Sequence, residues 1–232
     1  MSTVLIIAAH PDDEILGVGG TVAKHVAMGD KVFALILGEG QTSRFEVRDN
    51  APKALIDDLH HDSILAGRAV GFEKVLFENL PDNRFDTLDL LDVVKKVEKI
   101  ISELRPNIVY THHGGDLNGD LNIDHQITYQ AVLTATRPVN PCSVKELYTF
   151  ETLSSTEWNF LGGKHMFVPN VFIDVEEYFQ KKVEAMKCYK SELCEFPHPR
   201  SVKGMEVLAQ KWGSVVGKQY VEAFQLIRKI VE

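Results

Sequence analysis

Apolar runs alternate with helical periodicity through the first part of the chain. Uninterrupted apolar runs rich in β-branched residues cover residues 3–9 and 31–37, as is typical of parallel strands buried on both faces. Shorter runs at 74–77 and 107–111 predict two further strands. Apolar residues at helical spacing predict the intervening helices, at about 14–28, 52–69, 87–104 and 124–136. This order predicts an α/β fold with a mainly parallel sheet and helical crossovers.

The pattern is less regular in the last ninety or so residues. It predicts strands at 146–153 and 171–175, and helices at about 176–190 and 200–215. Because no repeat, low-complexity tract or linker interrupts the chain, we predict one domain over residues 1–232. Its two parts are a core and a C-terminal elaboration, at about 1–140 and about 141–232.

Composition narrows the functional classes. The content of 44% hydrophobic and 25% charged residues is ordinary for a soluble globular protein, and the net charge of -8 argues against broad binding to nucleic acid or anionic membranes. No apolar run approaches the roughly 20 residues needed to span a bilayer, and no secretory signal peptide is recognisable. Three cysteines without a CxxC pair predict neither a disulfide framework nor a thiolate zinc site. We therefore expect a cytoplasmic protein.

Two polar clusters each follow a predicted parallel strand. The first is the run His10-Pro11-Asp12-Asp13-Glu14, in which His10 and Asp13 can face one point if a helix begins there. The second spans residues 111–125 and ends at His125, which would open the next helix. Loops that follow neighbouring strands meet at the switch point of an open sheet. Two imidazoles and a carboxylate there would suit a catalytic metal such as zinc.

Plainer interpretations stay open for both clusters. The first cluster alone is also compatible with a solvated turn whose geometry Pro11 fixes, and His125 with an ordinary surface residue. The Asp- and Gly-rich stretch 116–124 resembles a calcium loop, but it lacks the glutamate that an EF-hand places twelve residues along. The coincidence of two clusters after two strands favours the metal hypothesis.

The motifs together resemble the LmbE-like/PIG-L family of zinc-dependent N-deacetylases. The resemblance covers most of the chain, and its most specific part is the run AHPDDE at residues 9–14. Weaker matching segments are Gly38-Glu39-Gly40 with Thr42-Ser43-Arg44, Pro81-Asp82-Asn83-Arg84-Phe85-Asp86, Thr111-His112-His113 through Asp124-His125, and His198-Pro199-Arg200-Ser201. The resemblance implies a Rossmann-like three-layer fold and removal of the acetyl group from an N-acetylated amino sugar, with release of acetate and a free amine. The expected sugar is of the N-acetylglucosamine type, with nucleotide-linked sugars and glycoconjugate precursors among the candidates.

The resemblance also implies roles for individual residues. His10, Asp13 and His125 would bind one zinc ion per subunit, and Asp12 would be the general base. The chain departs from a common family pattern at Asn122, where many members have a histidine that stabilises the intermediate or protonates the amine. Asp124 matches the carboxylate that orients this histidine, so both Asn122 and Asp124 are catalytic candidates. Other candidates for the proton donor are His112, His113 and His198.

Substrate contacts are predicted from loop residues. Arg44 is the first candidate because a guanidinium can bind sugar hydroxyls or a phosphate. Arg84, His198 and Arg200 are further candidates. Family members are often trimers or hexamers, so the resemblance implies a homo-oligomer. Two alternative functions stay open, a zinc-dependent amidase on a non-sugar or thiol-conjugate amide, and a non-catalytic Rossmann-like protein that binds a sugar or nucleotide.

Overall fold

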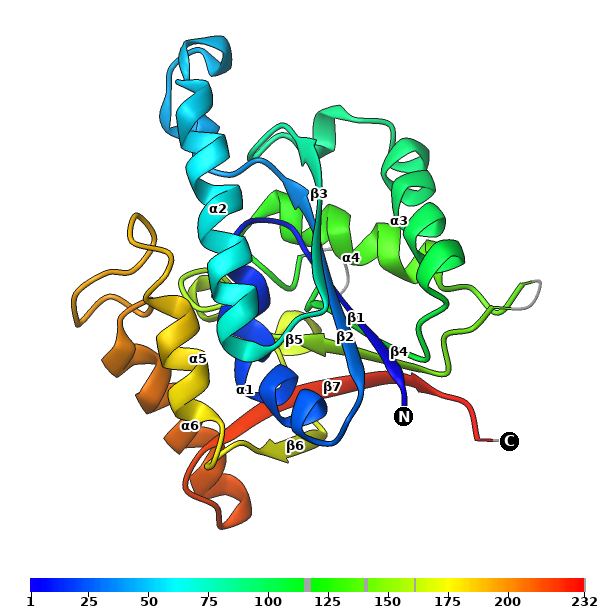
Figure 1. The fold of residues 1–232 in the computed structure, drawn as a ribbon, viewed down its shortest axis with the longest axis vertical. Coiled ribbons are helices and arrows are strands. Elements are labelled where there is room, and N and C mark those ends of the chain that lie inside the picture. The colour runs from blue at the N-terminus through cyan, green and yellow to red at the C-terminus, as the bar shows by residue number, and fades with distance from the viewer. Residues whose placement is uncertain (115–117, 140–141, 161, 232) are drawn as a thin grey trace.

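A computed structural model describes residues 1–114, 118–139, 142–160 and 162–231 as a three-layer α/β fold (Figure 1). Within these residues the sheet has seven strands in the order β3-β2-β1-β4-β5-β7-β6. The strands are β1 (Thr3–Ala8), β2 (Lys31–Gly38), β3 (Lys74–Leu80), β4 (Ile108–His112), β5 (Glu146–Phe150), β6 (Val171–Asp174) and β7 (Val221–Lys229). The helices are α1 (Asp13–Ala27), α2 (Lys53–Val70), α3 (Leu90–Leu104), α4 (Ile123–Ala135), α5 (Phe179–Met186) and α6 (Val202–Val216).

The sheet reverses its direction of growth next to β1. Strand β1 pairs in parallel with β2 on one side and with β4 on the other, and β3 and β5 continue the parallel sheet outward. The segments that follow β1 and β4 therefore leave the same edge of the sheet side by side, which is where open α/β sheets bind ligands. This confirms the predicted parallel sheet and the predicted proximity of the two polar clusters.

Alternate side chains of β1 enter two separate layers of the core. Val4 and Ile6 pack in the layer that contains residues of α1, α2, α5 and α6, while Leu5 and Ile7 pack in the layer that contains α3 and α4. Figure 1 shows the two helical layers on opposite sides of the sheet. All four side chains are fully buried, which explains why the strand reads as one continuous apolar run. No helix in the described part of the chain is both long enough and apolar enough to cross a bilayer.

The C-terminal part of the chain extends the same sheet. Strand β5 is parallel to β4, whereas β7 runs antiparallel between β5 and β6. Sequence reasoning missed β7. Although β7 is the last strand in the chain, it lies in the sheet between β5 and β6, which both precede it in the sequence.

Several element boundaries differ from those predicted. Strand β5 ends at Phe150 rather than 153, because the following residues turn toward a cavity described below. Strand β3 extends to Leu80, and helix α5 is shorter than the predicted 176–190. Helix α3 begins at Leu90 after a single 3-10 turn at Phe85–Thr87.

Helix α1 is held against the sheet by close packing and by a buried ion pair. A Cβ atom at Gly17 would lie 2.2 Å from Cδ2 of Phe150, so only glycine permits this approach. The Lys182 ammonium lies 2.6 Å from Oε1 of Glu222 and donates to the carbonyl oxygen of Leu16 at 2.8 Å. Glu222 also accepts the N–H groups of Gly20 and Thr21, at 3.0 and 2.7 Å. These contacts fix the helix whose first turn carries the polar cluster.

Candidate active site and metal centre

Asp12 stands at the N-cap position of α1 but does not cap the helix. Its φ of 107° lies in a region that residues other than glycine rarely adopt, and its side chain accepts no hydrogen bond from the first turn. The carboxylate instead lies 3.3 Å from Nη1 of Arg200. Backbone strain at this position therefore keeps a carboxylate directed toward the cavity and away from the helix end.

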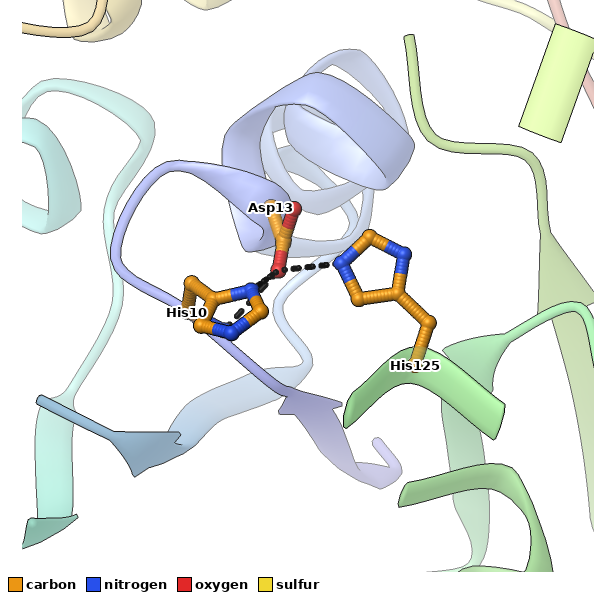
Figure 2. A group of neighbouring side chains, drawn as sticks. All are labelled: His10, Asp13 and His125. Carbon is orange, nitrogen blue, oxygen red and sulfur yellow. Dashed lines mark hydrogen bonds and ion pairs between the residues drawn. The ribbon is translucent and has the colours of Figure 1, made fainter. Parts of the chain in front are cut away.

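His10, Asp13 and His125 form one cluster at the carboxyl edge of the sheet, which we call the metal group. Oδ2 of Asp13 lies 3.3 Å from Nδ1 of His10 and 3.3 Å from Nε2 of His125 (Figure 2). One donor atom from each residue lies within 4.8 Å of the other two. Two imidazoles and one carboxylate are a typical donor set for a catalytic zinc ion, which also needs an open position. The residues present therefore fit the predicted metal.

Each imidazole has a carboxylate on its far nitrogen. Nε2 of His10 lies 2.9 Å from Oδ2 of Asp124, and Nδ1 of His125 lies 3.0 Å from Oδ1 of Asp120. Metal-binding histidines almost always use their second nitrogen in this way, because the contact fixes the tautomer and the ring orientation. The arrangement leaves Nδ1 of His10 and Nε2 of His125 facing Asp13.

The carboxylates raise the proton affinity of both rings. Burial alone would lower the pKa of His125, but Asp120 and Asp13 outweigh it and raise this pKa to about 9. Burial likewise opposes protonation of His10, while hydrogen bonds to Asp124 and Asp13 hold its pKa well above the ordinary value. A bound cation would take the place of these protons, so metal binding at neutral pH should release them.

Asp12 is buried beside other carboxylates, which disfavour its ionised form. Burial, followed by the negative charges of Asp13 and Glu192, raises its pKa well above the ordinary value, and Arg200 only partly offsets this. A carboxyl group with a raised pKa accepts a proton more readily at neutral pH, which suits a general base.

A second group that could hold a cation contains His10, Asp82 and Asp124. Both oxygens of Asp124 already accept backbone N–H groups, from Asn83 at 2.6 Å and from Phe85 at 2.9 Å. Because these bonds occupy its oxygens, the group with Asp13 and His125 is the better metal site.

His112 packs behind the metal group, whereas His113 contacts a different segment. Nε2 of His112 accepts the N–H of Ala9 at 2.9 Å, its ring stacks on His125 with centroids 3.9 Å apart, and burial lowers its pKa to about 3. Nε2 of His113 faces the carbonyl oxygen of His165. Neither histidine is among the described residues that line the cavity. Of the three histidines left open as proton donors, His198 alone is in that lining.

A cavity of about 360 Å³ opens over the metal group. Its lining includes the metal group, the catalytic candidates Asp12 and Asn122, and three of the four predicted substrate contacts, namely Arg44, His198 and Arg200. Segments from the whole chain length therefore meet at the predicted site.

Arg84 is not brought into the described lining of the cavity. Its side chain is exposed, while the residues on both sides of it, Asn83 and Phe85, donate their N–H groups to Asp124. The turn serves to position Asp124, and the pattern of residues did not indicate this role.

Asn122 lies in the lining of the cavity, whereas Asp124 lies outside the described lining. Asn122 lines the cavity and caps α4, with its side-chain oxygen accepting the N–H of Asp124 at 2.8 Å. Its amide N–H₂ group remains the donor that can serve a ligand. Asp124 is fully buried outside the described lining, so it positions His10 and is out of reach of a substrate.

The loop considered as a calcium site is only partly described, since residues 115–117 lie outside the described residues. Asp120 within it contacts His125 and accepts hydrogen bonds from the hydroxyl groups of Ser155 and Thr156. These contacts lower its pKa to about 2 against the effect of burial. Asp120 is thus already engaged in holding a histidine of the metal group.

Sequence reasoning missed Glu192. This residue lies after α5, is 4% exposed, and contacts Gln41, Arg44 and Arg200 in the cavity. The local sequence around it contains no motif, so only the spatial meeting of the two arginines identifies it.

Known proteins resemble this chain in sequence and in structure. The family model described as GlcNAc-PI de-N-acetylase, PIG-L, matches residues 5–136. An uncharacterized deacetylase of Escherichia coli, YaiS, is 31% identical over 194 residues, which cover 81% of this chain and 90% of that protein. A probable N-acetyl-α-D-glucosaminyl L-malate deacetylase of Bacillus cereus is 24% identical over 90% of this chain and 93% of its own length.

The fold matches a solved structure over nearly its full length. The N,N'-diacetylchitobiose deacetylase of Pyrococcus horikoshii superposes with a TM-score of 0.78 at 20% identity, over 98% of this chain and 84% of that one. This likeness concerns the fold, whereas the sequence matches above concern descent. On the family model and the E. coli relative together, the chain belongs to the PIG-L family.

Proposed function

We propose that this protein is a metal-dependent N-deacetylase that hydrolyses the acetamide of an N-acetylated amino sugar, with residues 1–232 acting as one catalytic domain. The observation that carries the proposal is the pairing of two neighbouring carboxylates with different environments. Asp13 faces two imidazoles, while Asp12 is directed into the cavity beside Arg200. Family membership and the deacetylases among the relatives support an amino-sugar substrate.

His10, Asp13 and His125 would hold the metal, which we propose is one zinc ion per subunit. When bound there, such an ion polarises a carbonyl oxygen and makes a water molecule acidic near neutral pH. Asp12 takes a proton from the attacking water at a carboxylate oxygen, and Arg200 holds that carboxylate in place. The same carboxyl group returns the proton to the departing amine, with His198 as the second candidate donor.

The cavity lining supplies the remaining contacts. The side-chain amide of Asn122 donates a hydrogen bond to the developing oxyanion, a role that needs a donor and no proton transfer. Arg44 and Arg200 present guanidinium groups for sugar hydroxyls. Asp124 acts through His10 as a positioning residue.

The protein's surroundings are part of the proposal. All three cysteines are free, which supports a reducing, cytoplasmic compartment. The homo-oligomer implied by the family resemblance, a trimer or hexamer, is a proposal that the measured mass in solution tests.

The deciding experiment combines metal analysis with acetate release. We expect purified protein to contain about one zinc per chain, and to release acetate from N-acetylglucosamine or diacetylchitobiose. Asp12→Asn should keep the metal and lose a factor of about 10² to 10⁴ in kcat. His125→Ala should lose the metal, whereas His61→Ala, at an exposed histidine of α2, should retain both metal and activity.

Contrary results separate the alternatives. Full activity of Asp12→Asn would reject Asp12 as the base. Metal without hydrolysis of any sugar amide would favour an amidase on a non-sugar or thiol-conjugate substrate. Protein without metal or hydrolysis would favour a non-catalytic sugar- or nucleotide-binding protein.

A further inference from the structure

One buried carboxylate joins both arginines of the cavity. Oε2 of Glu192 lies 2.8 Å from Nη2 of Arg44 and 2.8 Å from Nη1 of Arg200. Oε1 accepts a second hydrogen bond from Nη2 of Arg44 at 3.0 Å and another from the side chain of Gln41. Glu192 is 4% exposed, so water does little to screen its charge from the two guanidinium groups.

The lining of the cavity consequently offers no unpaired cation among the described residues. Apart from the imidazoles of His10 and His125, which already face carboxylates, its cationic side chains are Arg44 and Arg200, and both contact Glu192. Its carboxylates are Asp12, Asp13, Asp82 and Glu192. With a divalent metal bound and all four carboxylates ionised, these charges only balance. A phosphate or carboxylate on the substrate would therefore be repelled by Glu192. It would meet no cation in the lining whose charge is not already compensated.

Arg44 nevertheless keeps donors for uncharged groups. Its side chain is 50% exposed, and its described hydrogen bonds use Nη2 alone. The N–H groups on Nε and Nη1 remain available to sugar hydroxyls. The network thus provides oriented hydrogen-bond donors while its net charge is compensated by Glu192.

We infer that Glu192 is a specificity-determining residue, and that it makes the cavity favour N-acetylated sugars with an uncharged aglycone over the same sugars bearing a phosphate or carboxylate. This inference rests on the proposed deacetylase function, because it concerns the substrate of that same site. It excludes sugar phosphates and nucleotide-linked sugars as preferred substrates.

The test compares two sugars that differ in charge, methyl N-acetyl-α-glucosaminide and N-acetylglucosamine 1-phosphate. For each, kcat/KM for acetate release and Kd by calorimetry are measured on metal-replete protein. We expect the wild type to favour the neutral sugar by about tenfold or more. Glu192→Gln leaves Arg44 without its carboxylate partner and Arg200 with Asp12 alone, and it should lower this preference by about tenfold or invert it.

Glu39→Gln is the matched control. Glu39 is also buried and pairs with an arginine, Arg48, at 2.7 and 2.8 Å, but neither residue is in the described lining of the cavity. Glu39→Gln removes one negative charge, as Glu192→Gln does, and should leave the preference for the neutral sugar unchanged. Arg44→Gln, at a half-exposed side chain, removes a cation and should increase the preference for the neutral sugar.

The outcomes are distinct. A wild type that prefers the phosphate, or a Glu192→Gln variant with an unchanged preference, overturns the inference. If Glu192→Gln does not fold, the wild type and Arg44→Gln still decide the matter. If the wild type hydrolyses neither sugar, the proposed function fails, and the ratio of the two Kd values still tests the charge preference. Absence of binding by the neutral sugar overturns the inference as well.

Discussion

Oδ2 of Asp124 lies 2.9 Å from Nε2 of His10, so a carboxylate at the start of α4 fixes the imidazole that follows β1. The same carboxylate accepts the N–H groups of Asn83 and Phe85, which tie the turn after β3 to the site. Three parallel strands thus contribute to the orientation of one proposed metal ligand. Their common edge explains how residues so far apart in sequence meet.

Replacing Asp124 by asparagine should weaken metal binding without removing a ligand. The amide cannot supply the negative charge that makes His10 a strong donor, so we expect metal affinity to fall by about 10- to 100-fold. A competition titration with a chromophoric chelator measures this change. Asp86→Asn, at an exposed position of the same segment, is the control and should bind metal normally. Equal affinities in the two variants would contradict the positioning role.

Glu14 should make stability depend on pH. Burial raises its pKa from an ordinary 4.5 to about 7, although hydrogen bonds, led by that from Tyr189, work in the opposite direction. Between these two values the folded state retains a proton that the unfolded state releases. The free energy of unfolding contributed by this group is therefore present below pH 4.5 and is lost as the pH rises through 7, by an amount on the order of 3 kcal/mol.

Glu14→Gln removes this titration. In metal-free protein, the stability of the variant relative to wild type should rise between pH 4.5 and pH 8, as measured by urea unfolding at both pH values. Glu177→Gln, at an exposed glutamate, should show no such change. A relative stability that falls with pH would show that the carboxyl group is held ionised.

Gly17→Ala should loosen the packing of α1 against the sheet. The added methyl group would lie 2.2 Å from the ring of Phe150, and the overpacking should cost about 1 to 3 kcal/mol despite the higher helix propensity of alanine. Thermal and urea unfolding measure the loss. Gly19→Ala in the same helix meets the side chain of Lys182 at 3.1 Å and should cost less. A larger loss for Gly19→Ala would reverse the assigned order of packing.

The parallel half of the fold and the metal group were predictable from the sequence because their signals are local. Strand β1 is buried on both faces and therefore reads as an unbroken apolar run, and the polar cluster follows it directly. The comparisons confirm the family and the fold, while the roles of single site residues stay proposals.

The remaining features depend on contacts that local sequence does not encode. The role of Glu192 is visible only from its contact with Arg44, which lies 148 residues earlier in the chain. Arg84 belongs to a turn whose neighbours face Asp124, and the residue types alone did not reveal which side chains would point outward. Strand β7 was missed because its pairing partners lie far from it in the sequence, and because Glu222, Gln225 and Arg228 leave its nine residues with neither an unbroken apolar run nor a regular alternation.

The insertion of β7 between β5 and β6 has a consequence for truncated chains. A chain shortened before Val221 loses the strand that bridges β6 to the sheet, and with it Glu222. Lys182 would then keep an ammonium group buried against α1 without its carboxylate partner. During synthesis, all residues of the metal group precede this strand by almost a hundred positions. The residues of the metal group are therefore translated long before β7, whose Glu222 accepts hydrogen bonds from α1.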